Sequence, residues 1–154
     1  MQLNAAIYAT DLEVVTGANQ ISADHTQITP TTGTGAAPTF ALDTAALGGM
    51  YANKITMIGT EAGLGVRNAG NLGASNGNLI VTAAGRLENT GTLEGTRVEL
   101  VSAGGIDNRG GMIRQTSSAG LTITSPTLSN TNGGVIGVEL SLIHISEPTR
   151  PERI

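Results

Sequence analysis

Residues 85–95, GRLENTGTLEG, bring together an apolar residue, an asparagine, a glycine and a second apolar residue. The same order returns at residues 104–113, GGIDNRGGMI, and at residues 126–136, PTLSNTNGGVI. The three asparagines, Asn89, Asn108 and Asn130, are 19 and then 22 positions apart (108 − 89 and 130 − 108). A period near twenty residues is typical of a solenoid, in which each coil packs only on its neighbours.

The residues between the asparagines have the pattern of strands. LIVTA at 79–83, RVELVSA at 97–103 and LTITS at 121–125 alternate apolar with polar or small residues and are rich in β-branched side chains. Glycine and asparagine interrupt the chain too often for helices. We therefore expect an all-β fold, a parallel β-helix (β-solenoid) with roughly 20-residue coils of two or three strands. The chirality of strand crossovers predicts a right-handed helix.

Alignment of the repeats predicts the core. Apolar residues at matching positions must all face inward, because a shift of one residue would turn every side chain to the other face. Asparagine and glycine at the bends are expected to tolerate positive φ. Stacked asparagine side chains can also bond from coil to coil. The residues expected to point inward are Leu79, Val81, Leu87, Leu93, Val98, Leu100, Ile106, Ile113, Leu121, Ile123, Leu128 and Ile136.

The composition supports a strand-rich fold and argues against several classes of function. Aromatic residues make up 2% of the 154 residues, whereas there are 22 glycines. The chain has no cysteine, which excludes a disulfide framework and a thiolate metal site. Its net charge is −4 and it has no cluster of basic residues, which argues against nucleic-acid binding. It has no apolar run long enough to span a membrane and no signal-peptide pattern.

The repeat organises most of the chain. We expect a β-helix over residues 1–139, with strands around residues 7–8 and 12–15 and the Asn-x-Gly repeats over 77–139. Residues 21–45 contain Thr, Pro and Gly with little apolar content, so we expect a long loop or an extruded hairpin there.

Residues 140–154, LSLIHISEPTRPERI, differ in composition from everything before them. They resemble the translation of a common sequencing-library adapter, and we interpret them as a non-native tail. His144 then has no functional meaning, and the natural protein is expected to continue beyond Glu139. The alternative is a genuine amphipathic end segment.

Acidic residues offer one candidate for chemistry. Glu88 and Asp107 occupy equivalent positions beside the repeat asparagines, so they should lie one coil apart, about 4.8 Å. Two carboxylates at that spacing could share a cation. This keeps open an alternative function, a polysaccharide-acting β-helix enzyme (lyase or hydrolase). We favour the interpretation that both acids are solvated and face outward.

Other polar motifs give weaker signals. His25 beside Asp24 has no nucleophile pattern near it, and GLGVRNAG at 63–70 lacks the Lys-Ser/Thr end of a phosphate-binding loop. The repeat arginines Arg97, Arg109 and Arg114 could meet an anionic glycan, but we favour solvated faces. We therefore expect no enzyme, and no catalytic, cofactor-binding or metal-binding residues.

Two upstream stretches carry a resemblance to a known family. They are YATDLEVVTGANQ at 8–20 and ALDTAALGGMYANKITMIGTEAGLGVRNAG at 41–70. Together they resemble the filamentous haemagglutinin group of two-partner secretion exoproteins, which includes adhesins, haemolysins and contact-dependent growth inhibition proteins. The resemblance implies a secreted right-handed β-helix at the outer surface of a Gram-negative cell, exported by a dedicated outer-membrane transporter.

The resemblance has limits that shape the expectation. The Asn-Pro-Asn motifs of the family's secretion domain are not found, so the chain is expected to begin near or just after the end of that domain. Which branch the parent belongs to stays open. The expected function is that of a structural or adhesive shaft segment, which mediates adhesion or presents a distal binding or toxin region. The expected partners are the transporter and a receptor or glycan on a host or neighbouring cell.

Overall fold

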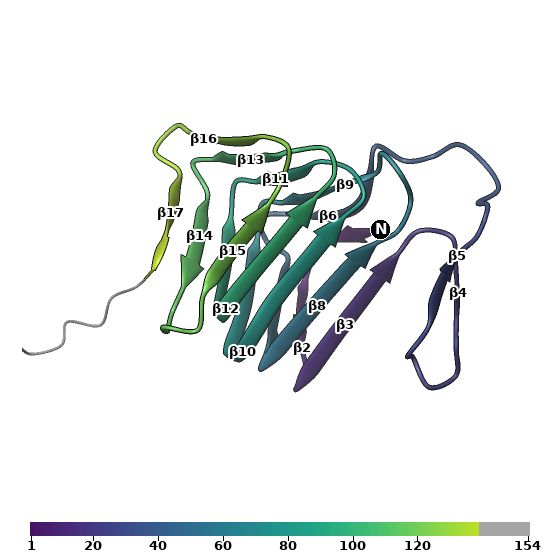
Figure 1. Cartoon of the computed structure of the whole chain (residues 1–154), viewed down its shortest axis with the longest axis horizontal. Helices are drawn as coiled ribbons and strands as arrows, with labels where there is room; N and C mark the ends of the chain where they lie inside the picture. Colours follow the sequence, from purple (N-terminus) through teal and green to yellow (C-terminus); the bar gives the residue numbers. More distant parts are fainter. Residues whose placement is uncertain (139–154) are drawn as a thin grey trace, which may run out of the picture.

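The computed structural model describes residues 1–138, which form strands and turns without any helix. Figure 1 shows the strands lying side by side in successive coils along one axis. The long-range strand pairs within the stack are parallel, so the chain is a parallel β-helix. This confirms the fold expected from the repeat. The suspected tail at 140–154 lies outside the described residues.

One face of the helix is a six-stranded sheet, with each strand contributed by the next coil. Its strands, in spatial order, are β1 (Gln2–Leu3), β6 (Phe40–Thr44), β9 (Gly65–Asn68), β11 (Leu87–Asn89), β13 (Ile106–Arg109) and β16 (Leu128–Thr131). Every strand in this order pairs in parallel with the next.

The other face is a nine-stranded sheet. In some coils it contains one long strand, and in others two shorter strands lie end to end and pair with that long strand. The long strands are β10 (Asn71–Ala83) and β12 (Thr92–Ser102). The shorter strands are β2 (Ala6–Tyr8), β3 (Asp11–Thr16), β7 (Gly49–Ala52), β8 (Lys54–Gly59), β14 (Met112–Gln115), β15 (Leu121–Thr124) and β17 (Val135–Val138). β7 and β8 both pair with β10, and β14 and β15 both pair with β12.

The register of the strands confirms the alignment of the repeats. Leu79 pairs with Val98, which pairs with Leu121 in the next coil. Leu93 pairs with Ile113 in the same way. The period of about twenty residues is therefore the length of one coil, and each repeat position becomes a column along the axis.

These columns form the core. Eight of the twelve residues expected to point inward are at most 2% exposed: Leu79, Val81, Leu87, Leu93, Val98, Leu100, Ile106 and Ile113. Leu121, Ile123 and Ile136 are partly buried against them. Each fully buried aliphatic side chain stabilises the fold by roughly 1.5–3 kcal/mol, an upper estimate because the unfolded chain is itself compact.

Leu128 differs from the other core positions. It pairs with Ile106 as expected but is 50% exposed. It lies on β16, the last strand of its sheet in the described part of the chain. Among the described residues, Leu128 therefore has a neighbouring coil on one side, where β13 pairs with β16.

Residues 21–45, expected to form a long loop or an extruded hairpin, contain the end of one strand and two further strands. β4 (Asn19–Ile21) and β5 (Ile28–Pro30) form an antiparallel hairpin that projects away from the coils (Figure 1). β6 returns to the coil at Phe40, so the expected loop boundary at residue 45 is wrong. Leu42 explains the difference, because it is completely buried and pairs with Val66 of the next coil.

Candidate functional site

A row of asparagine side chains runs inside the turn between the two sheets. Asn68 Nδ2 donates to Asn89 Oδ1 at 2.9 Å, and Asn89 Nδ2 donates to Asn108 Oδ1 at 2.7 Å. Asn108 Nδ2 then donates to Asn130 Oδ1 at 2.8 Å. We call these four residues the asparagine ladder. The bonds confirm the expected coil-to-coil stacking of asparagine.

Each residue of the ladder also fixes its own turn. Asn89 Nδ2 donates to the Gly91 carbonyl at 3.1 Å, and Asn108 Nδ2 donates to the Gly111 carbonyl at 2.9 Å. Asn68, Asn89 and Asn108 are completely buried. Buried amides need such partners, because an unpaired donor or acceptor costs about 1–3 kcal/mol. The ladder therefore joins successive coils and closes each turn with the same amide groups.

The ladder begins one coil before the repeats that the sequence analysis aligned. Asn68 lies in the GLGVRNAG stretch, which forms strand β9 and its turn. The signal for it was present, because Asn68-Ala69-Gly70 has the spacing of Asn89-Thr90-Gly91. Thr44 occupies the same position one coil earlier and pairs with Asn68 in register.

The glycines of the turns serve close packing, and the expected role in positive φ is wrong for most of them. Gly91 has no positive φ, but a Cβ there would lie 2.7 Å from the carbonyl carbon of Ala69 in the previous coil. A Cβ on Gly111 would lie 2.5 Å from Asn89 Nδ2. Only glycine allows adjacent coils to approach so closely at this corner.

Positive φ occurs where a turn is lengthened. The Asn108 turn holds one residue more than the Asn89 turn, and Gly110 has a φ of 66°. In the following turn Asn132 and Gly133 have φ values of 53° and 75°. Gly110 adds one residue before Asn130, but most of the extra length lies further on: Gly95 and Val98 are three residues apart, whereas their partners Gln115 and Leu121 are six apart (121 − 115). Gly120 in that stretch also has a positive φ, 118°, and Asn130 stays on the ladder although the spacing grows to 22 residues.

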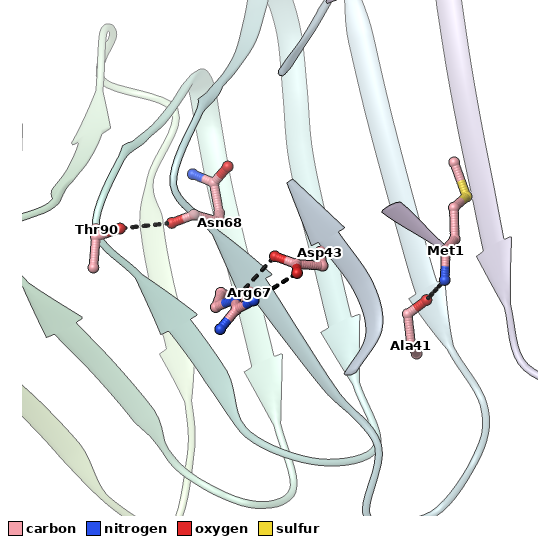
Figure 2. Close-up of polar contacts among 6 residues, drawn as sticks. All are labelled: Met1, Ala41, Asp43, Arg67, Asn68 and Thr90. Atoms are coloured by element: carbon pink, nitrogen blue, oxygen red, sulfur yellow. Dashed lines mark hydrogen bonds and ion pairs between the residues drawn. The ribbon is translucent and has the colours of Figure 1, made fainter. Parts of the chain in front are cut away.

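Charged residues form a second column on the outer face of the six-stranded sheet. Arg67 donates from Nε and Nη2 to the two carboxylate oxygens of Asp43, at 2.9 and 2.6 Å, as Figure 2 shows. The hydrogen bonds from Arg67 lower the pKa of Asp43, and the same bonds raise the pKa of Arg67. The guanidinium also lies 4.8 Å from the centre of the Phe40 ring, within cation–π range.

Glu88 and Asp107 continue this column and are register partners, as the repeat predicted. Asp107 is not the solvated acid that we expected, because it is only 9% exposed. Arg109 and Arg86 pair with its Oδ2 at 3.3 and 3.8 Å, while Oδ1 is buried without a hydrogen-bond partner. Asp107 is therefore held between two guanidinium groups.

The three repeat arginines do not form one basic patch. They lie on β12, β13 and β14, and each has an acidic partner. Arg97 pairs with Glu99 at 3.4 Å, Arg109 pairs with Asp107, and Arg114 pairs with Glu94.

Asp24 and His25 form the tip of the projecting hairpin. His25 has a φ of 58° and its amide donates to the Ser22 carbonyl at 2.9 Å. Asp24 accepts hydrogen bonds from the Thr26 hydroxyl and amide at 2.9 and 3.3 Å. Hydrogen bonds from Ser22 and Thr26 lower the pKa of Asp24. These contacts form a local turn.

Two further features are missing from the described part of the chain. Within residues 1–138, no group of three or more His, Cys, Asp or Glu side chains could hold a metal ion. In the same part of the chain, no helix has the length and apolar character needed to cross a membrane.

The family follows from a match that covers more than half of the chain. Residues 1–89 match the model of the TPS secretion domain. The chain belongs to this family. The matched stretch runs from β1 to the end of β11, which includes the projecting hairpin and the first two residues of the asparagine ladder.

Several curated proteins are similar to the chain. Toxin CdiA of Yersinia pestis is 45% identical over 112 residues, which is 71% of this chain and 3% of that protein. The tRNA nuclease CdiA of Escherichia coli O6:K15:H31 is 42% identical over 131 residues, 82% of this chain and 4% of that protein. The 16S rRNA endonuclease CdiA of Enterobacter cloacae subsp. cloacae is 40% identical over 126 residues, 79% of this chain and 4% of that protein. This chain therefore spans a few per cent of the length of these relatives. No solved structure gave a significant match.

The family match confirms the resemblance to two-partner secretion exoproteins and revises one detail. Residues 1–89 lie within the secretion domain, where the missing Asn-Pro-Asn motifs had suggested a start near or after its end. The structure gives the physical reason. Secretion domain and repeats are built from the same coils, and Asn89 at the end of the match bonds directly to Asn108 beyond it.

Proposed function

We propose that this chain is a secretion module joined to the first part of a rigid shaft in a secreted two-partner secretion exoprotein. The parent protein is of the contact-dependent growth inhibition type, and it is exported by a dedicated transporter to the outer surface of a Gram-negative cell. One observation carries the proposal. The asparagine ladder runs from Asn68 to Asn130 without a break at residue 89, where the secretion-domain match ends.

The names of the relatives support a structural role for this segment. One is named a tRNA nuclease and another a 16S rRNA endonuclease, yet each contains a segment that is 40–42% identical to this chain. A segment common to proteins with different named activities is better suited to export and support than to either reaction. We therefore propose that the chain is not an enzyme, and that a distal region of the parent meets a receptor or glycan on a host or neighbouring cell.

The geometry of the acids also favours a structural role over the polysaccharide enzyme. Glycosidases need two carboxylates that flank a scissile bond, with one of them able to donate a proton. Asp107 instead pairs with Arg86 and Arg109. Its neighbour Glu88 lies on the adjacent strand of the same face, and not across a cleft.

Export can be tested directly. The 154-residue chain, preceded by a periplasmic export signal, would be expressed in a Gram-negative host with the outer-membrane transporter of a CdiA relative. We expect the chain in the medium or on the cell surface when the transporter is present, and in the periplasm when a porin replaces it. Retention in the periplasm despite a functional transporter would contradict the proposal.

Catalysis can be tested on the purified chain. We expect no cleavage of acidic or neutral polysaccharides, with or without calcium. Turnover that Asp107→Ala abolishes would contradict the structural role and favour the enzyme.

A further inference from the structure

A groove of about 600 Å³ lies on the nine-stranded sheet, over strands β2, β7, β10, β12 and β14. Two tyrosines, Tyr8 and Tyr51, line one part of it, and the ion pair of Glu94 and Arg114 lines another. Asn71 and Thr92 also border the groove. It is distinct from the charged column, which lies on the other sheet.

The register explains why the groove is open. One column of outward-facing positions runs through Tyr8, Tyr51, Gly73, Glu94 and Arg114. Gly73 interrupts this column because it has no side chain. A Cβ there would meet only Tyr51 Cδ1, at 3.7 Å. Since Tyr51 and Glu94 lie two strands apart, their backbones are separated by about 10 Å. The space above Gly73 is a slot one strand wide.

The aromatic side of the slot is fixed by contacts within the protein. The rings of Tyr8 and Tyr51 are stacked, with centres 5.2 Å apart and planes inclined by 17°. Gly49 allows the Tyr51 ring to lie close to the sheet, because a Cβ there would be 2.9 Å from Tyr51 Cε2. Asn71 Nδ2 donates to the Tyr51 hydroxyl at 3.4 Å. The Tyr51 ring thus forms one side of the slot, with Tyr8 on the strand before it and Gly73 on the strand after it.

The opposite side of the slot is formed by the ion pair of Glu94 and Arg114, whose two charges are opposite. Arg114 Nε donates to Glu94 Oε2 at 3.0 Å, and Arg114 Nη2 donates to the same oxygen. Glu94 and Arg114 are about one-third exposed and line the groove, so a ligand there can contact both side chains. A ligand with net charge would gain from one member of the pair and be repelled by the other. A neutral ligand rich in hydroxyl groups can bond to both.

We propose that this slot binds a neutral pyranose residue of a glycan. The apolar C–H face of the sugar would lie on the Tyr51 ring, and its hydroxyl groups would bond to Glu94, Arg114 and Asn71. Flat aromatic rings beside a few placed polar groups are typical of small-ligand sites. A peptide that adds a strand is disfavoured, because peptides of that kind need a free sheet edge and the slot lies on the face of β10, which is paired on both sides.

This inference goes beyond the proposed secretion and shaft role and does not depend on it. It adds a glycan contact on the shaft itself, whereas the proposed function places cell contact in a distal region. Loss of glycan binding would leave export intact, and failure of export would leave the purified chain able to bind sugar. The two proposals can therefore fail separately.

The chain offers an internal reporter for the test. Tyr8 and Tyr51 are the only tyrosines, and there is no tryptophan, so all tyrosine fluorescence comes from the slot. The purified chain would be titrated with lactose, N-acetyllactosamine, cellobiose and maltose, with sialyllactose as an anionic probe and a proline-rich peptide as a protein-like probe. Saturation-transfer NMR would show which protons of the sugar contact the rings.

We expect saturable binding of at least one neutral disaccharide, with contacts on one face of a single pyranose. Gly73→Thr should weaken it at least tenfold by filling the slot, since Gly73 has no positive φ to strain. The matched control is Gly137→Thr, in the same column on β17, where a Cβ would meet nothing within 4 Å. It should bind like the wild type.

Tyr51→Ala should also weaken binding at least tenfold, whereas Tyr51→Phe should keep most of it. This second pair tests the site if Gly73→Thr does not fold. The proposal would be overturned if no neutral sugar binds, if the anionic or peptide probe binds instead, or if Gly73→Thr and Tyr51→Ala bind as well as the wild type.

Discussion

Asn89 Nδ2 donates a 2.7 Å hydrogen bond to Asn108 Oδ1, 19 residues further along the chain. Both side chains are completely buried. This bond turns a period in the sequence into a contact between coils, and it is repeated before and after by Asn68 and Asn130. The alignment of neighbouring coils thus depends on polar groups inside the stack as well as on its apolar columns.

Asn108→Ala tests the contribution of the ladder to stability. Its amide bonds to Asn130 Oδ1 and the Gly111 carbonyl, and it accepts from Asn89. Removal leaves these buried groups short of partners, so we expect the free energy of unfolding to fall by about 2–4 kcal/mol. Urea denaturation followed by circular dichroism measures the change. Asn76→Ala is the matched control, because Asn76 is exposed with a single 3.5 Å contact. Equal effects of the two variants would argue against the ladder.

Gly91→Ala tests the close approach of coils at the corner. The added Cβ would lie 2.7 Å from the Ala69 carbonyl carbon, so the two coils would have to separate. We expect a loss of about 1–3 kcal/mol in the free energy of unfolding. Gly137→Ala, where a Cβ meets nothing within 4 Å, should have little effect. If Gly91→Ala were as stable as the wild type, the corner would be looser than described.

Thr44→Val tests the position that precedes the ladder. Thr44 is completely buried, and its hydroxyl has no hydrogen-bond partner. Valine has nearly the same shape without the unpaired hydroxyl, so we expect the free energy of unfolding to rise by about 1 kcal/mol. A decrease of that size would mean that the hydroxyl is satisfied after all. The thermal midpoint of the two proteins, compared in one buffer, gives the answer.

Asp43 should make stability depend on pH in the acid range. Its folded pKa is lowered by the hydrogen bonds from Arg67, so its ionised form favours the folded state. That contribution is present above the ordinary aspartate pKa of about 3.9 and is lost as the pH falls through the lower folded pKa. The stability difference between wild type and Asp43→Asn should therefore be constant near neutrality and shrink below about pH 4. A difference that stays the same into strong acid would contradict the assignment. The effect should be small, because Arg67 is about half exposed.

The sequence predicted the parts of the fold that repeat locally. Strands near Leu79 and Val98 alternate with period two, and the coil length places them in one column, so both register and core followed from the pattern. Asp107 was misjudged because its exposure depends on Arg86, which reaches it from the preceding coil. Close approach at Gly91 is likewise a property of two neighbouring coils, and a single repeat does not reveal it.

The groove could not have been predicted from the repeat. Tyr8 and Tyr51 are register partners although they are 43 residues apart (51 − 8), about twice the coil length. The projecting hairpin adds the extra residues between them, which hides the period in the first coils. Asn68 was missed although it has the spacing of the other ladder residues, because the GLGVRNAG stretch around it was considered only as a phosphate-binding loop.

The most direct test of the ladder as the link between coils is a double-mutant cycle on Asn89 and Asn108. Unfolding free energies of Asn89→Ala, Asn108→Ala and the double variant would be measured by urea denaturation. Asn68→Ala and Asn130→Ala form the matched cycle, since these residues belong to the same ladder without touching. We predict a coupling of about 1 kcal/mol or more for the bonded pair and less than about 0.5 kcal/mol for the separated pair. Additive losses at Asn89 and Asn108 would contradict the claim that their side chains hold neighbouring coils together.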